Sequence, residues 1–331
     1  MADTINTTST ISNRTCAHAA TQMLVRALPY LVLEKFGQTY VLPTNSTKVV
    51  KFRRFEALDS TPQSLTEATT PPAKALVPTD VTATVAQYGD RVIISDMVMD
   101  TNEDPVLKSA VEVLGEQAAQ MIEKVRIGVL NASTNVVYSG TAAAPADVDK
   151  AITLGDVRKV TRKMRAQMAR PVTSIVRSTP SFDTKNIQPS YVWVVHPSME
   201  ADIRSITGFK DAVDYGQQSA WENEIGSVEG VRFVWTTLMP VQPDTGKTPT
   251  GVESTGGTKA DVYTSFVIAR DSYGIVPLKG ANALTPMVVN PTPSDSDPLG
   301  QRGHVGWKTC QTAVILNSAW LIKFMCAVTK Y

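Results

Sequence analysis

The chain is poor in the residues that build disulfide frameworks and metal sites. The cysteines and histidines are few and scattered: Cys16, Cys310 and Cys326, and His18, His196 and His304. Three cysteines without a C-x-x-C motif argue against a disulfide framework and favour buried free thiols, consistent with a reducing cytoplasm. The histidines have no ligand-like spacing, so we expect no metal site and no cofactor.

Catalytic motifs are also missing. The chain contains neither a G-x-S-x-G nucleophile elbow nor an H-E-x-x-H helix. Gly246-Lys247-Thr248 resembles the end of a phosphate-binding loop, but Val241 replaces the first glycine, so we expect a surface turn. Asp295 and Asp297 resemble the start of a calcium loop, which fails because Gly306 stands where a bidentate glutamate is needed. The sequence therefore predicts a protein that is not an enzyme.

Neither a strong net charge nor a membrane-spanning run is present. Lys and Arg number 32 and Asp and Glu 31, so no overall field directs the chain to nucleic acid. The most apolar run, Thr312–Val328, contains Asn317 and Lys323 and is shorter than the roughly 20 residues that a spanning helix needs. Two buried strands joined near Asn317-Ser318 fit it better. The polar N-terminus predicts no signal peptide.

The chain does contain a long interrupted ribbon. Residues 39–55 and 80–99 have strand-like patterns, and the proline-rich loop 56–78 separates them. Two strands with so long a tip predict a projecting arm over 39–95, which needs another subunit to cover its apolar residues. The basic residues of the first strand are candidate intersubunit contacts: Lys51, Arg53 and Arg54.

Helical patterns precede and follow this ribbon. A Thr/Ser/Asn-rich arm, 1–13, leads into a predicted helix over 14–28. The strongest helix spans 104–130, where apolar residues recur at spacings of three and four; at ~1.5 Å per residue it forms a rod of roughly 40 Å. Another helix is predicted over 154–169, with Thr153 as its N-cap.

The helix over 154–169 is strongly basic. Arg158, Lys159, Arg162 and Lys163 are candidates for contact with the phosphates of double-stranded DNA, which would be salt-dependent and blind to base sequence. The alternative is a solvated helix face that forms salt bridges to other subunits.

From residue 190 the pattern is mixed, which gives an α+β fold class. Strands are predicted over 191–195, 231–235, 261–270 and 284–289, with a short helix over 198–206. The segment Asp295–Thr309 is dense in glycine and charge, and predicts a shaped turn before the closing strands. Its candidate intersubunit contacts are Arg302 and Lys308.

Several sequence blocks occur in an order that resembles the coat proteins of N-four-like short-tailed phages. They are Gln87–Asp96, the Val195–Pro197 turn with Ile203-Arg204, Asn223–Gly226 with Gly230–Phe233, Tyr273–Val276, and Asp297–Gly303 continuing through Gly306–Lys308. One block alone would be weak, whereas the ordered series is fairly specific. The N-terminal 40 residues and the loop 240–260 carry no resemblance.

The resemblance implies a Hong Kong 97-type capsid fold, with an N-terminal arm, an extended β-hairpin loop, a long spine helix, and peripheral and axial domains. The elements predicted from the residues agree with it. In chain order the expected parts are an N-terminal arm and helix (1–38), the extended hairpin arm (39–99), the spine helix with part of the peripheral domain (100–189), the axial domain (190–290), and the signature loop with the closing strands (291–331).

The resemblance also implies a function: the major capsid protein of a tailed double-stranded DNA phage, self-assembling as hexamers and pentamers into an icosahedral shell. Axial loops such as 208–230 or 240–260 would meet at capsomer centres. Expected partners are further copies, a portal, scaffolding or decoration proteins and packaged DNA, with assembly in the host cytoplasm and a final place in the virion. Two alternatives stay open: an encapsulin-like nanocompartment shell, and a carbohydrate-binding virion protein, against which the 7% aromatic content argues.

Overall fold

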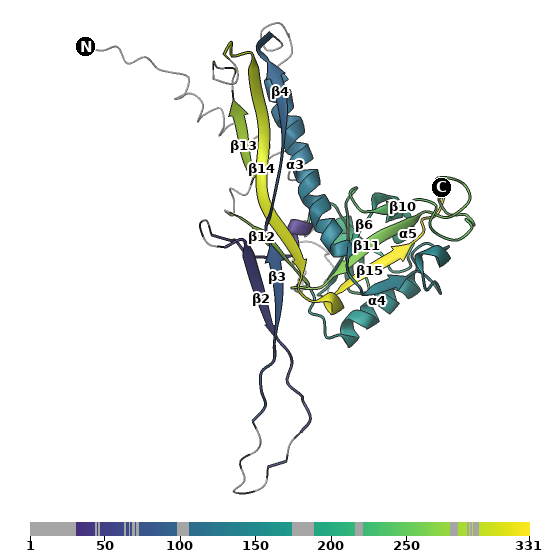
Figure 1. Cartoon of the computed structure of the whole chain (residues 1–331). Helices are drawn as coiled ribbons and strands as arrows, with labels where there is room; N and C mark the ends of the chain where they lie inside the picture. The colour runs from purple at the N-terminus through teal and green to yellow at the C-terminus, as the bar shows by residue number, and fades with distance from the viewer. Residues whose placement is uncertain are drawn as a thin grey trace, which may run out of the picture.

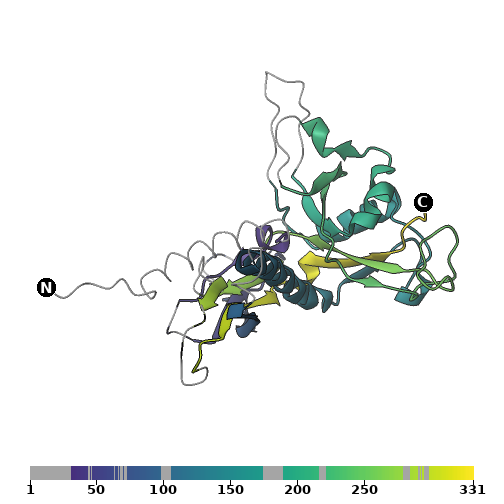
Figure 2. The same ribbon diagram turned by 90° about the horizontal axis from the view of Figure 1, so that it is seen from above.

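The chain forms a flat arm, a hairpin that extends beyond one end of the arm, and a domain at its side (Figure 1). Figure 2 shows this side domain extending away from helix α3 (Val106–Asn131). The computed structural model describes residues 31–331 except 44, 46, 63, 66, 68, 69, 71, 72, 98–105, 174–188, 216–220, 279–283, 290, 292 and 294–297. The predicted arm 1–13 and helix 14–28 lie outside the described residues.

The arm consists of α3 packed on a five-stranded sheet. Its strands are β1 (Gln38–Thr39), β4 (Ala86–Ser95), β12 (Tyr273–Pro277), β13 (Leu284–Val289) and β14 (Arg302–Ile315). The long strand β14 is central, antiparallel to β4 on one edge and to β13 and β12 on the other. Val111 and Leu114 of α3 are buried against Val305 and Trp307. The predicted long helix is confirmed.

The hairpin pairs β2 (Val49–Phe55) antiparallel with β3 (Pro78–Thr84). The described residues of the loop 56–77 form neither helix nor strand, as predicted. However, the expected ribbon over 39–95 is too long. After Val85 the chain leaves the hairpin, and β4 pairs with β14 in the arm. A strand with one open face has the same alternating pattern in a ribbon or at a sheet edge, so the sequence could not distinguish the two.

The side domain is built on an eight-stranded sheet. Its strand order is β5-β15-β11-β6-β9-β8-β7, with β10 paired to β11. The strands are β5 (Val136–Tyr138), β6 (Tyr191–Val195), β7 (Lys210–Asp211), β8 (Glu224–Val228), β9 (Val231–Trp235), β10 (Val241–Gln242), β11 (Val262–Ile268) and β15 (Leu321–Cys326). In its core, Trp193 stacks on Phe233 with ring centroids 5.4 Å apart and meets Phe324 edge-on at 4.9 Å.

Helices cover this sheet and connect the parts. They are α4 (Leu154–Ala166) and α5 (Glu200–Arg204), with 3₁₀ turns η2 (Leu33–Lys35), η3 (Pro145–Asp147), η4 (Pro197–Met199), η5 (Ala212–Tyr215) and η7 (Ser318–Trp320). Val157, Val160 and Met164 of α4 are buried in the same core as Trp193. The predicted capping of this helix by Thr153 is confirmed.

The C-terminal apolar run is confirmed as two strands, but they belong to different sheets. β14 ends in the arm, and β15 lies in the side domain. The segment Asp295–Thr309, predicted as a shaped turn, is a strand from Arg302 onward. At Gly306 a Cβ would lie 2.8 Å from the Asp90 carbonyl oxygen, so this glycine allows close strand approach and does not mark a turn. Gly300, with a φ of 64°, does adopt a turn conformation.

The sheets do not follow the chain in contiguous blocks. β12 and β13 fall within the range expected for the axial domain, 190–290, yet they lie in the arm sheet. Conversely, β5 and α4 from the 100–189 range lie in the side domain. The sheets alone do not test the expected division of the chain into five parts, which remains a prediction. Among the described residues, no helix is both long and apolar enough to span a bilayer.

Candidate assembly surfaces

The hairpin exposes large apolar side chains near its tip. Phe55, Leu58, Leu65 and Leu76 are 56%, 51%, 73% and 62% exposed. A two-stranded ribbon has no second layer of its own to cover such groups. Full burial of such a side chain contributes about 1.5–3 kcal/mol, so burying the part of each that is still exposed would contribute roughly 1–2 kcal/mol. The tip is therefore suited to lie on another apolar surface.

The same tip has a net negative charge: its three acids face a single cation, Lys74, whose Nζ donates to the backbone carbonyl oxygen of Asp59 at 2.8 Å. The acids are Glu56, Asp59 and Glu67, so the loop 56–77 has two more negative than positive side chains. The Asp59 carboxylate accepts hydrogen bonds from the hydroxyl and the backbone N–H of Thr61, and these hold its pKa below the usual value. A matching surface for this tip would be apolar and edged with positive charge.

The predicted contact residues at the base of the hairpin differ in their surroundings. Arg53 donates two hydrogen bonds to Asp80, from Nε to Oδ1 at 2.8 Å and from Nη2 to Oδ2 at 2.9 Å. These bonds fasten the two strands in register and lower the pKa of Asp80. Lys51 and Arg54 are exposed on the same strand. Arg53 is thus engaged within its own hairpin, and Lys51 and Arg54 remain the stronger candidates.

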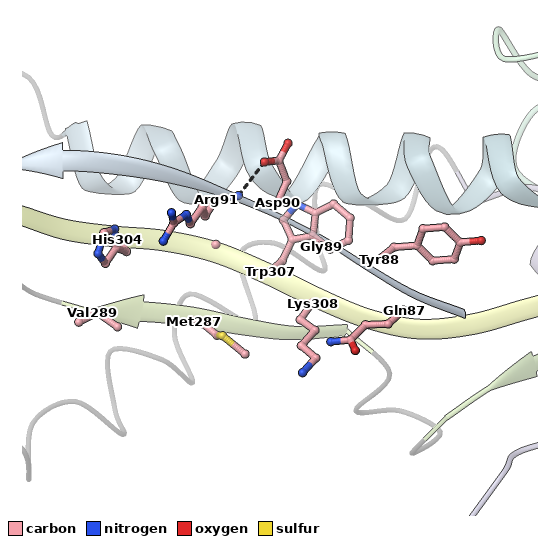
Figure 3. A pocket seen from close by; sticks show the side chains of 11 residues that line it. Gln87, Tyr88, Gly89, Asp90, Arg91, Met287, Val289, His304, Trp307 and Lys308 are labelled. Carbon is pink, nitrogen blue, oxygen red and sulfur yellow. Dashed lines mark hydrogen bonds between the residues drawn. The ribbon is translucent and has the colours of Figure 1, made fainter. Parts of the chain in front are cut away.

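The face of the arm sheet away from α3 contains an open groove of about 620 Å³. It is lined by Gln87, Tyr88, Gly89, Asp90, Arg91, Met287, Val289, His304, Gly306, Trp307 and Lys308. In Figure 3, Asp90 extends toward α3, whereas Lys308 extends to the other side of β14. Alternation along the paired strands puts Ile93, Met287 and Val289 on the outer face, where they are 53%, 46% and 51% exposed.

Glycines form the floor of this groove. A Cβ at Gly89 would lie 2.7 Å from the carbonyl oxygen of Trp307, so backbone occupies the space of side chains there. Arg91 and Lys308 give the rim positive charge. Asp90 is the sole acidic residue of the lining; it accepts hydrogen bonds from the Gln117 side chain on α3 and from a backbone N–H, which lower its pKa. The groove is apolar with a basic rim.

The predicted intersubunit contacts thus fall on two surfaces. Lys308 lines the groove and Arg302 is exposed at the start of β14, whereas the other three lie on the hairpin. Arg91, Met287 and Val289 were not among the residues predicted from the sequence. Period-two alternation in their strands was a usable signal, but the sequence did not show that β4 and β13 flank the same strand.

The predicted basic residues of α4 do come together. Arg158, Lys159, Arg162 and Lys163 line one shallow groove along the helix, and Arg165 lines a second one beside it. Partial burial lowers the pKa of Lys163, and the positive charge of the neighbouring Lys159 lowers it further.

Other chemistry is sparse. In the described part of the chain, no three His, Cys, Asp or Glu residues are grouped as metal ligands; Asp295 and Asp297 lie outside that part. His196 accepts a hydrogen bond at Nδ1 from the Ser198 N–H, a local capping role, and burial lowers its pKa. Burial also raises the pKa of the Cys326 thiol.

The long helix on a sheet, the extended hairpin and the side domain together form a Hong Kong 97-type capsid fold. The sequence model for phage capsid protein matches residues 78–307, well over half of the chain. The chain therefore belongs to the phage capsid protein family. No curated protein sequence matches it.

Solved structures agree on the fold. The capsid of Ralstonia phage GP4 is 12% identical with a TM-score of 0.62, over 89% of this chain and 87% of that one. The cyanophage Pam1 capsid is 14% identical with a TM-score of 0.64, over 92% and 93%. The holo-SrpI encapsulin complex from Synechococcus elongatus is 10% identical with a TM-score of 0.55, over 90% and 88%. At these identities the likenesses show the fold, and the family match decides for a phage protein. The prediction of a structural major capsid protein is confirmed.

Proposed function

We propose that copies of this chain form hexamers and pentamers of a closed shell around double-stranded DNA, with the hairpin tip of one copy lying in the arm groove of a neighbour. The observation that carries this proposal is complementarity within one chain. The tip is apolar and acidic, and the groove is apolar with a basic rim. Figure 1 shows the hairpin directed away from β13, so a tip does not lie near the groove of its own chain.

The remaining roles follow the same scheme. The loop 240–260 and the C-terminus lie together, joined by the bridge between Val252 and Thr329, at the end of the side domain remote from α3 (Figure 1). In the proposed shell, axial loops such as this end, or the described residues of 208–230, face the capsomer centre. A portal and scaffolding or decoration proteins would complete the particle, which assembles in the host cytoplasm.

A double substitution on the hairpin tests the proposal. Leu58→Asp with Leu65→Asp should stop the formation of large particles, seen by electron microscopy and light scattering, while leaving circular dichroism unchanged. Met168→Asp is the matched control, because Met168 is 80% exposed and lies on neither surface. Normal particles from the double variant would refute the docking scheme. A wild-type chain that yields small particles of fixed stoichiometry under all assembly conditions would refute the shell function.

A further inference from the structure

The exposed face of α4 concentrates positive charge in a chain that is nearly neutral overall. The residues are Arg158, Lys159, Arg162, Lys163 and Arg165, whereas the whole chain has a net charge of +1. Arg158 and Arg162 are four residues apart, as are Lys159 and Lys163, so like charges are neighbours on the helix surface and repel each other. A negative partner would relieve this repulsion.

The shape of this face suits an extended polyanion. Grooves of about 550 and 670 Å³ run along α4, and Arg158 and Arg162 line both. At ~1.5 Å per residue, the cations from Arg158 to Arg165 are spread over roughly 10 Å of helix. Ala166 is the largest apolar residue in either lining. The apolar hairpin tip of a second copy therefore fits this face poorly, while phosphates fit it well.

One acidic residue on this face would compete with a bound polyanion for the cations. Glu229 lies in the tight turn between β8 and β9, with a φ of 44°, followed by Gly230 at 82°. Its carboxylate accepts hydrogen bonds from Arg158: from Nε at 2.9 and 3.0 Å, and from Nη2 at 2.6 Å. Among the residues lining the two grooves, Glu229 is the sole acid. Asp156 of the same helix is buried and engaged in its N-terminal cap.

We infer that the α4 face binds the phosphate backbone of double-stranded DNA without sequence preference, and that Glu229 restrains this binding by holding Arg158. The inference rests on the proposed function, in which the shell encloses DNA. Phosphate contacts by arginine and lysine release counterions, so the affinity must fall steeply with salt. Moderate affinity at this face would hold DNA without fixing its path.

Fluorescence anisotropy of a short labelled duplex, with the full-length unassembled protein, tests the inference. The logarithm of the affinity falls linearly with the logarithm of the salt concentration, and this decline should become shallower by about 0.9 for each phosphate contact removed. Arg162→Gln with Lys163→Gln should therefore weaken binding and flatten the slope by about 1.8. Glu229→Gln should do the opposite: it frees Arg158, tightens binding and steepens the slope by about 0.9. Duplexes of different sequence should bind alike.

Lys51→Gln with Arg54→Gln is the matched control, because it removes the same charge from the hairpin and should leave the slope as in the wild type. Circular dichroism checks that all variants fold. Wild-type protein that does not bind the duplex at low salt, or α4 variants with the wild-type slope, would overturn the inference. So would displacement of the duplex by a peptide of residues 55–74, which would assign the face to a second copy. Electron microscopy of the same wild-type protein separates the two proposals: normal shells without DNA binding would refute only this inference.

Discussion

The Glu123 carboxylate on α3 accepts the backbone N–H of Leu33 at 2.7 Å, although the two residues are 90 positions apart. The Nη1 atom of Arg126 lies 3.6 Å from Oε2 of Glu123 and 3.4 Å from Oε2 of Glu34. The Tyr273 hydroxyl of β12 donates to the carbonyl oxygen of Leu33. The chain near Leu33 is therefore hydrogen-bonded to both layers of the arm, the helix α3 and the sheet strand β12. These contacts hold the segment around Leu33 against the arm.

Because the Glu123 carboxyl is buried, we expect the stability of the folded chain to depend on pH. Burial raises the pKa of Glu123 from 4.5 to about 7, against the opposing effects of Arg126 and the backbone N–H groups. The folded state then binds a proton more tightly than the unfolded state. The resulting stabilisation is fully present below about pH 4.5 and is lost as the pH rises through about 7, a difference on the order of 3 kcal/mol. Glu123→Gln should remove this dependence.

Thermal unfolding at pH 5 and pH 8 measures the effect. The wild type should lose more stability between the two values than Glu123→Gln does. Glu222→Gln is the control, since Glu222 forms an exposed pair with Lys35, and exposed pairs contribute little. Equal pH dependence in wild type and Glu123→Gln would contradict the role given to this carboxylate.

Gly306 should tolerate no side chain. Gly306→Ala would bring a Cβ to 2.8 Å from the Asp90 carbonyl oxygen, forcing β4 and β14 apart. We expect a loss of about 1–3 kcal/mol of unfolding free energy, measured by chemical denaturation. Gly128→Ala in α3 is the contrast: outside the helix's own backbone, nothing lies within 4 Å of the Cβ that alanine would add, so alanine should stabilise the helix by about 0.5–1 kcal/mol. Equal effects at the two glycines would contradict the close approach.

The elements that the sequence predicted well are those with local signals. The helix around Leu114 and the buried strand around Trp193 have dense apolar patterns within a few residues. Residues Arg158 and Arg162 share a face because helical spacing requires it. The pairing of Arg158 with Glu229 could not be predicted from the sequence, because this contact joins residues 71 positions apart.

The arm groove could not be predicted for the same reason. Arg91 and Met287 belong to strands that flank β14 on opposite edges, and their proximity depends on non-local pairing. The glycines of β14 also suggested a turn, because a glycine required by close strand approach has the same identity as one required by a positive φ. Gly300 and Gly306 illustrate the two cases.

The cap of α4 contributes measurably to the side domain. The Thr153 hydroxyl accepts the N–H of Asp156 at 3.3 Å, and the Asp156 carboxylate accepts the N–H of Thr153 at 3.1 Å. Thr153→Ala should cost about 1 kcal/mol of unfolding free energy, seen as a lower denaturation midpoint. Thr258→Ala, at an exposed loop position, should have no such effect. An unchanged midpoint for Thr153→Ala would show that the cap does not limit stability.

Charge reversal in the arm groove should prevent assembly without unfolding the subunit. Arg91→Glu with Lys308→Glu turns the rim negative, so it would repel the acidic hairpin tip. Light scattering should then detect subunits or small oligomers in place of large particles. Adding Glu56→Lys and Glu67→Lys should restore large particles in part. Efficient assembly of the groove variant by itself would count against electrostatic matching.

Electron cryomicroscopy of particles assembled from this chain tests the docking of the hairpin most directly. We expect residues 55–77 of each copy to lie across the outer face of β4, β13 and β14 of a neighbour, with Leu58 and Leu65 buried there. A shell in which this face is open to solvent, or is covered by another part of the chain, would contradict it.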